Sequence, residues 1–244
     1  MPIRADNYFN FYLGASAEYH VISKIYMHGF EALKYSPDIG FDLHVSNKSQ
    51  VCFHKEEPFA LDLQIKSTFL VDNKAIFFLK KEEVDFLVKQ KNCAMIFCNV
   101  IADFFKDPES FADYRGCELE YAENNLLSFR NHVYKCQYKN TDIKWPVEYC
   151  DIDDFEMSLF WLNSNQLCEA IKRNVLREIS ADRYILPIFY ENNVLFFGDK
   201  SDDTEPCRAI QEIKTLKYLL KGCHGSKSLG RGAFLSKYAE YSVG

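Results

Sequence analysis

The stretch Leu61-Asp62-Leu63-Gln64-Ile65-Lys66-Ser67-Thr68 decides how this chain is expected to fold. Aliphatic side chains at 61, 63 and 65 alternate with polar ones at 62, 64 and 66, and this period of two predicts a strand that buries one face. The acid, the amide and the lysine then share the other face. Such a row suits a metal and phosphate site, and it equally suits the charged solvent face of an edge strand.

A second short strand is predicted directly upstream, over residues 41–46, after a turn marked by Pro37 and Gly40. The alternation places Asp42 and His44 on one face and apolar side chains on the other. Two neighbouring strands then turn polar groups toward one cleft while their apolar sides join a core.

The wider pattern predicts a mixed α/β fold. A chain of 244 residues with 48% hydrophobic residues can bury a full core. Residues 1–105 are expected to form a mixed central sheet with flanking helices, and residues 106–244 an α+β lobe packed on it. The expected elements of the first part are a helix (14–29), strands (30–35, 41–46, 59–68, 75–79 and 93–101), a polar hairpin (47–58) and a helix (81–91).

The second part carries weaker patterns. Residues 103–123 are read as loop and short helix, and 132–138 as a strand. The acidic run 148–156 lacks the spacing of a calcium loop and is interpreted as capping carboxylates ahead of a helix. The remaining expectations are a helix capped by Asn163-Ser164 (to about 175), a β-hairpin (184–190 with 194–197) and a last helix (210–220).

Composition limits the compartment and the partners. The nine cysteines are scattered without a CxxC pair, which favours reduced thiols in the cytoplasm, and no apolar run is long enough for a membrane helix. The net charge is −6, yet residues 214–244 carry +5, with Lys227 and Arg231 in a Gly/Ser-rich stretch, against −11 for the rest. This basic tail indicates a polyanion partner or, equally, a solvated helix face followed by a loop.

Glu18 is the third candidate acid. It precedes Ile22 by four residues and Ile25 by seven, so it falls on the apolar stripe of the first predicted helix. A carboxylate there is costly unless it faces a cation or a donor. A plain surface position is the alternative, because the helix dipole also favours an acid near an N-terminus.

Taken together, Gly14-Ala-x-Ala-Glu18-Tyr, Asp38-x-Gly40-x-Asp42-Leu and Leu63-Gln64-Ile65-Lys66-Ser67-Thr68 resemble the PD-(D/E)XK, or restriction-endonuclease-like, nuclease superfamily. The likeness covers about residues 14–100 and is strongest to the branch with Gln-x-Lys in the last motif. It implies a metal-dependent nuclease acting on DNA, with RNA not excluded, in defence, mobile-element biology or repair. Many such nucleases act as homodimers, so a homodimer is also an expectation.

The resemblance implies a set of roles for these residues. Asp42, the Gln64 side chain, the Ile65 carbonyl and Glu18 would hold Mg²⁺ or Mn²⁺, and Lys66 would stabilise the attacking hydroxide and the transition state. Asp42 is preferred over Asp38 as main ligand because it is predicted to lie inside the strand. His44, Ser67, Lys227 and Arg231 are weaker candidates for nucleic-acid contacts, and Asp62 for a direct role.

Two other functions compete with this reading. The glutamine and the acidic net charge fit a nuclease-fold protein with a weak or inactive centre that binds nucleic acid or protein. The third possibility is an interaction protein without nucleic-acid chemistry, since 15 Tyr and 21 Phe can supply an interface.

Overall fold

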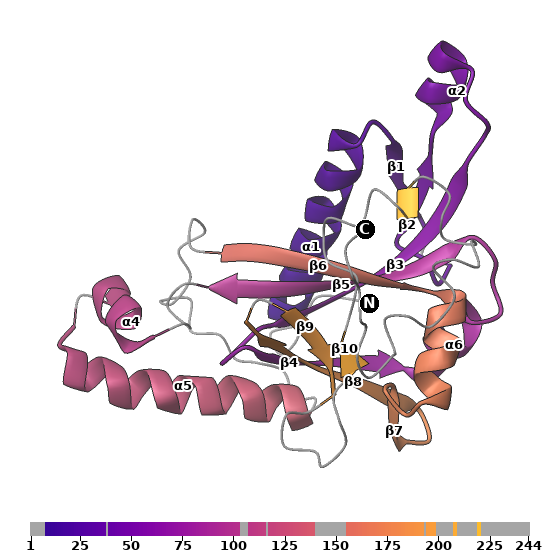
Figure 1. The fold of residues 1–244 in the computed structure, drawn as a ribbon. Helices are drawn as coiled ribbons and strands as arrows, with labels where there is room; N and C mark the ends of the chain where they lie inside the picture. The colour runs from indigo at the N-terminus through magenta and orange to yellow at the C-terminus, as the bar shows by residue number, and fades with distance from the viewer. Residues whose placement is uncertain are drawn as a thin grey trace.

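Two sheets and two long helices make the body of the protein (Figure 1). The computed structural model describes residues 8–37, 39–102, 107–115, 117–139, 155–192, 194–198, 207–208 and 219–220. The first sheet, sheet A, has five strands in the order β1-β2-β3-β5-β6. Their bounds are Glu31–Lys34, Leu43–Ser46, Ala60–Phe69, Cys93–Ala102 and Phe155–Asn163. Only the β3–β5 pair is parallel.

The second sheet, sheet B, is antiparallel, with the order β10-β9-β8-β4 and β7 paired to β8. Its strands are β4 (Lys74–Lys80), β7 (Arg177–Ser180), β8 (Arg183–Glu191), β9 (Val194–Phe197) and β10 (Cys207–Arg208). The predicted mixed α/β class is therefore confirmed. β4 lies early in the chain but joins sheet B, and β6 lies late but joins sheet A, so strands cross the predicted boundary at residue 105.

The helices flank these sheets. Helix α1 (Tyr8–Met27) lies on one face of sheet A, and α6 (Ser164–Lys172) joins β6 to β7. Asn163 caps α6, as predicted: its side chain accepts from the Gln166 N–H while the Gln166 side chain accepts from the Asn163 N–H. The remaining helices are α2 (Lys48–His54), α3 (Lys81–Leu87), α4 (Pro108–Arg115) and α5 (Leu119–Lys139).

Sheet A is buried on two sides by separate apolar clusters. Strand β5 shows this best, because Ala94, Ile96 and Cys98 face α1 whereas Met95 and Phe97 face sheet B. Phe97 stacks on Phe160 with ring centroids 4.7 Å apart. This confirms the prediction of a strand buried on both faces.

Several predictions of secondary structure were wrong. The polar hairpin expected at 47–58 contains helix α2, and the strand expected at 132–138 belongs to helix α5. Strand β6, not a helix, begins after residue 154. The acidic residues 148–154 and most of the helix expected at 210–220 lie outside the described residues.

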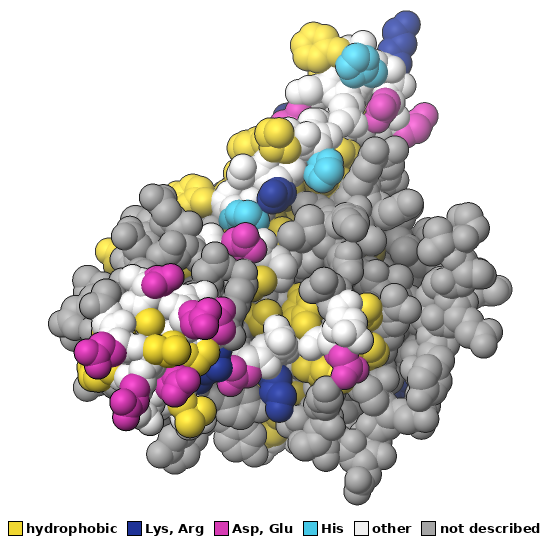
Figure 2. Space-filling view, turned by 60° about the vertical axis from the view of Figure 1, so that its left-hand side comes forward, with side chains coloured by type: hydrophobic (Ala, Val, Ile, Leu, Met, Phe, Trp, Pro, Cys, Tyr) yellow, Lys and Arg dark blue, Asp and Glu magenta, His cyan; other side chains and the backbone are white. Residues whose placement is uncertain are grey.

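The described surface is uneven in charge. Acidic side chains gather over α4 and the start of α5 (Figure 2), where Glu109, Asp113, Glu120 and Glu123 are exposed. Within the described ranges no helix has both the length and the apolar character needed to cross a membrane. Cys52, Cys93, Cys98, Cys117 and Cys168 are free thiols, as expected of a reduced protein.

Candidate functional site

The polar side chains predicted to share a face do so. We call Asp42, His44, Asp62, Gln64 and Lys66 the polar strip; they alternate with buried apolar residues of β2 and β3 that pack toward α1. The register places His44 opposite Asp62, and Leu43 opposite Leu63. The strip thus lies on the face of sheet A that, farther along, packs on sheet B.

Asp42 occupies the centre of the strip. Its Oδ2 atom accepts hydrogen bonds from the Ile65 N–H at 2.6 Å and from Gln64 Nε2 at 2.8 Å. Strand β2 begins at Leu43, so Asp42 lies one residue before the strand rather than inside it as predicted. Its own N–H nevertheless continues the ladder by donating to the Leu63 carbonyl at 2.8 Å. Asp38 lies outside the described residues, so the choice between the two aspartates stays a prediction.

Lys66 lies one pleat beyond Gln64 on β3. It pairs with an acid that was not among the candidates predicted from the sequence. Its Nζ atom is 2.6 Å from Oε2 of Glu83, in the first turn of α3. Both side chains are about one-fifth exposed, at 22% and 21%. The only sequence signal for Glu83 was an acid just after a predicted strand, which carries no information on its distance from Lys66.

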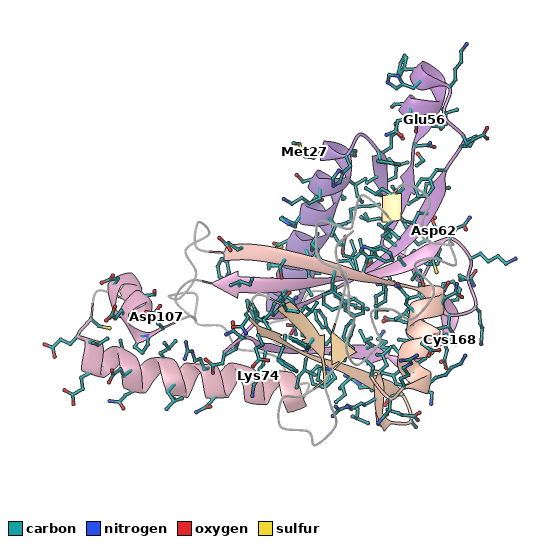
Figure 3. All side chains as sticks on the ribbon, viewed as in Figure 1. Met27, Glu56, Asp62, Lys74, Asp107 and Cys168 are labelled. Carbon is teal, nitrogen blue, oxygen red and sulfur yellow. The ribbon has the colours of Figure 1, made fainter. Side chains whose placement is uncertain are left out.

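At the other end of the strip, three side chains form a hydrogen-bonded group. The Tyr35 hydroxyl donates to Asp62 Oδ1 at 2.7 Å, and His44 Nδ1 lies 2.8 Å from the same oxygen. Burial, followed by this bond to Asp62, raises the pKa of Tyr35 to about 12. Figure 3 labels Asp62 near the start of β3. The group fixes the His44 ring within the strip.

Glu18 is not in the strip. It lies on α1, on the opposite side of sheet A, and its Oε2 atom is 2.6 Å from Nζ of Lys34. The hydrogen bond with Glu18 raises the pKa of Lys34, and the charge of Asp42 adds to the shift. The prediction that a carboxylate here needs a cation is met by a lysine of the protein itself. The structure therefore brings Asp42, Gln64 and Ile65 into contact, with Lys66 on the same strand, and pairs Glu18 with Lys34, so the role of Glu18 at an ion stays a prediction.

The weaker candidates for nucleic-acid contacts do not extend the strip within the described residues. Ser67 lies on the α1 side of β3, away from Lys66, because strand neighbours point to opposite faces. Thr68 is buried and donates to the Ile76 carbonyl at 3.2 Å. Lys227 and Arg231 lie outside the described residues, so their predicted role in nucleic-acid binding is neither supported nor opposed.

The oxygen donors of the strip suit a single hard cation. The Gln64 amide nitrogen donates to Asp42, so the amide has to turn over to offer its oxygen to an ion beside that carboxylate. The Ile65 carbonyl faces the same edge as its N–H, because both groups of a strand residue point to one side. Only one of these donors is charged, and no three His, Cys, Asp or Glu side chains of the described residues gather into a metal site. The arrangement fits a weak site for one ion.

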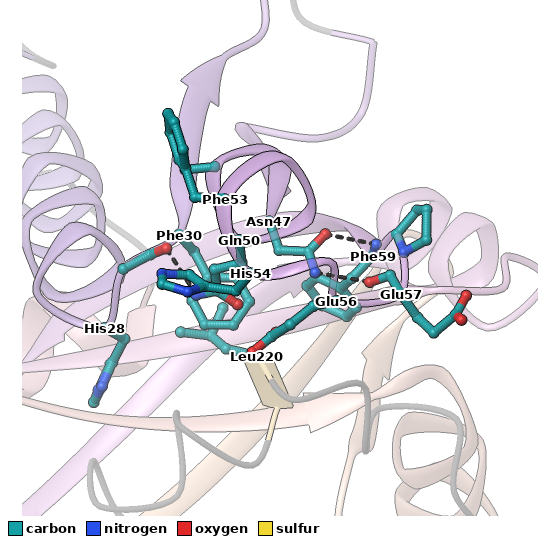
Figure 4. A pocket seen from close by; sticks show the side chains of 13 residues that line it. His28, Phe30, Asn47, Gln50, Phe53, His54, Glu56, Glu57, Phe59 and Leu220 are labelled. Atoms are coloured by element: carbon teal, nitrogen blue, oxygen red, sulfur yellow. Dashed lines mark hydrogen bonds between the residues drawn. The ribbon is translucent and has the colours of Figure 1, made fainter.

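A separate cleft of about 870 Å³ lies where α2 meets the end of α1 (Figure 4). Its lining includes His28, Phe53, His54, Glu56 and Leu220. Asn47 links two parts of the lining of this cleft: its side chain donates to the Glu57 carbonyl at 2.8 Å and accepts from the Phe59 N–H at 2.7 Å. This cleft was not predicted from the sequence, because residues 47–58 were expected to form a hairpin rather than helix α2.

Comparison with known proteins adds no relative. No protein family, curated protein or solved structure matches this chain. The resemblance to PD-(D/E)XK nucleases therefore stays a prediction that depends on the residues of the strip.

Proposed function

We propose that this protein is a metal-dependent nuclease that hydrolyses phosphodiester bonds at the polar strip, with DNA as the first substrate to test and RNA as the second. One observation carries the proposal: Asp42, bonded to Gln64 and to the Ile65 N–H, lies on the same face of the sheet as Lys66, one pleat away. An acid, a neutral oxygen donor and a lysine in this order provide the groups that phosphodiester hydrolysis needs.

Each residue has a distinct task in this proposal. Asp42, the Gln64 side-chain oxygen and the Ile65 carbonyl would hold Mg²⁺ or Mn²⁺. The ion would supply Lewis acidity to the phosphate and lower the pKa of a bound water. Lys66 would place its ammonium against the negative charge that grows on the phosphate oxygens. Glu18 is paired with Lys34 and would reach the ion, directly or through water, only after that pair opens.

A nucleic-acid-binding protein with a weak or inactive centre is the second candidate. It is favoured by the charge of the site, which contains one acid among its three oxygen donors and a lysine already paired with Glu83. The cytoplasmic location and the homodimer, both expected from the sequence, accompany either version as proposals.

Cleavage assays separate the two candidates. Purified protein with Mg²⁺ or Mn²⁺ is incubated with plasmid, single-stranded DNA and RNA, beside Asp42→Asn and Lys66→Met. Each substitution is expected to lower the cleavage rate by at least about a hundredfold, the usual cost of removing a group that stabilises a transition state.

Two exposed residues provide matched controls, namely Asp113→Asn on α4 and Lys89→Met after α3. Both controls are expected to retain the wild-type rate. Cleavage that persists in Asp42→Asn or Lys66→Met would indicate a contaminant or another centre. Binding without any cleavage would favour the second candidate.

A further inference from the structure

Glu83 places a carboxylate between two lysine ammonium groups, one of which belongs to the polar strip. Its Oε2 atom lies 2.6 Å from the Lys66 ammonium, and its Oε1 atom lies 3.7 Å from the Lys80 ammonium. One acid thus faces two lysines that come from different sheets, Lys66 from β3 and Lys80 from β4. A phosphate group in this position would meet the same two ammonium groups.

The contact is an ion pair rather than a directed hydrogen bond. Oε2 of Glu83 is buried and accepts no well-oriented hydrogen bond from any described residue, so the Lys66 ammonium is its charge partner. Among the described residues, no backbone N–H donates to the Glu83 carboxylate. An acid held only by opposite charge can exchange for another anion without loss of a backbone contact.

The charge around Lys66 makes such an exchange consequential. Asp42 and Gln64 bind each other within the strip, whereas the Lys66 charge is met by Glu83. An anion that reaches Lys66 must therefore compete with that carboxylate. The cost of separating Lys66 from Glu83 is subtracted from the binding free energy of any phosphate that takes its place.

We infer that Glu83 is an internal mimic of the substrate phosphate: it holds Lys66 in the free protein and yields that ammonium to a backbone phosphate of the bound nucleic acid. This inference rests on the proposed function, because it takes nucleic acid as the ligand of the strip. It assigns Glu83 a regulatory role in binding, in addition to any role in orienting Lys66.

The test is Glu83→Gln, which removes the charge and keeps the shape. Binding of fluorescein-labelled DNA and RNA oligonucleotides is measured without divalent metal, over a series of salt concentrations. One more lysine free for phosphate raises the slope of log Kd against log salt by about 0.7–0.9, and at about 0.1 M salt it tightens binding roughly five- to eightfold.

Glu82→Gln is the matched control. Glu82 lies on the same turn of α3, but its side chain is 81% exposed and 4.0 Å from Lys80. The Glu82→Gln substitution removes the same charge without freeing Lys66, so we expect a much smaller change in the Kd for nucleic acid. The double variant Lys66→Met/Glu83→Gln is expected to lose the gain. Thermal unfolding of each variant confirms that it is folded.

The outcomes distinguish this inference from the proposed function. If the wild type binds nucleic acid but Glu83→Gln binds no tighter, or if Glu82→Gln shows the same gain, the inference is wrong and the proposed function stands. If the gain survives in the double variant, Lys66 is not the residue that Glu83 restrains. If neither the wild type nor Glu83→Gln binds, the inference is wrong, and cleavage in Mg²⁺ or Mn²⁺ alone decides the proposed function.

Discussion

The two ends of sheet A are built on opposite principles. At the β5–β6 end both faces are covered, by α1 on one side and sheet B on the other, and aromatic rings such as Phe97 and Phe160 fill the space. At the β1–β2 end α1 covers one face, while Leu33 on the other remains open to solvent. The polar strip lies at the border between the two ends. A sheet that is covered over part of one face has a place where charged groups can remain near water and still be held by a rigid core.

The largest expected effect is at the covered end. Phe97 is fully buried and lies 4.7 Å from the ring of Phe160 and 4.9 Å from that of Phe77, between centroids. Phe97→Ala leaves a cavity that the two sheets cannot fill, so the free energy of unfolding should fall by about 3–5 kcal/mol. Urea unfolding followed by circular dichroism measures it.

Phe53→Ala is the control for that loss, because the Phe53 side chain on α2 is 80% exposed. Its effect should stay within about 0.5 kcal/mol. Equal losses in the two variants would mean that the covered and the open end contribute alike to stability, which would remove the basis of the comparison.

The next effect concerns the polar strip, at the border between the two ends, where the stability of a more acidic variant should depend on divalent metal. Gln64→Glu sets two carboxylates side by side, since Asp42 Oδ2 and Gln64 Nε2 are 2.8 Å apart. Without divalent ions we expect a loss of about 1–3 kcal/mol, from repulsion and from the lost hydrogen bond. Mg²⁺ at about 100 times its Kd should return roughly 2.7 kcal/mol. Thermal unfolding in EDTA and in Mg²⁺ gives both quantities.

Asn124→Asp, at an exposed position on α5, adds the same charge and should show no response to Mg²⁺ beyond that of the wild type. Calorimetry of the wild type should give one weak Mg²⁺ site per chain, because only one donor in the strip is charged. Two tightly bound ions, or a Gln64→Glu variant indifferent to Mg²⁺, would contradict the view of the strip as an ion site.

The smallest expected effect is at the open end, where Glu31 holds helix α2 in place. Its carboxylate accepts from the N–H groups of Lys48 at 2.7 Å and Ser49 at 2.8 Å, and from the Ser46 and Ser49 hydroxyls. Burial acts to raise the pKa of Glu31, but the hydrogen bonds from Ser49, Lys48 and Ser46 prevail and lower it to about 2. Glu31→Ala should cost about 1 kcal/mol, as for the loss of a helix cap.

The pH dependence has a definite sign. Because the folded-state pKa of Glu31 lies below its usual value of 4.5, its contribution is present above about pH 4.5 and is lost as the pH falls toward 2. The stability of Glu31→Ala should approach that of the wild type over this window, whereas Glu56→Ala, which removes an exposed acid after α2, should run parallel to the wild type. A constant difference for Glu31→Ala would show that its charge does not stabilise α2.

This capping arrangement also shows why part of the fold escaped prediction. Asn47 precedes α2 but its side chain makes no capping hydrogen bond, and the cap comes from Glu31, sixteen residues before Asn47 in the chain. Local sequence contains no trace of such a partner. By contrast, α6 carries its capping box within Asn163 and Gln166, and its start was predicted.

The polar strip was predictable because its signal, like that of the α6 cap, is local: alternation within β2 and β3 sets which side chains share a face. The pairing of Glu18 with Lys34 was not, because the distance between a helix residue and a strand depends on how the layers pack. The residues 132–138 alternate weakly, yet α5 buries Ala122 and Leu126, four residues apart, and the helical period prevails. Glu83 was missed because its partner Lys66 comes from another element.

The exchange of β4 and β6 between the sheets has a consequence for how the protein can be divided. A fragment ending near residue 105 would carry β4 without β8 and would leave the long, apolar edge of β5 without β6. Unpaired edges of this kind invite association with other chains. The two parts are interlocked, so evolution or an engineer can exchange the polar strip residue by residue but cannot transplant it as a free-standing module.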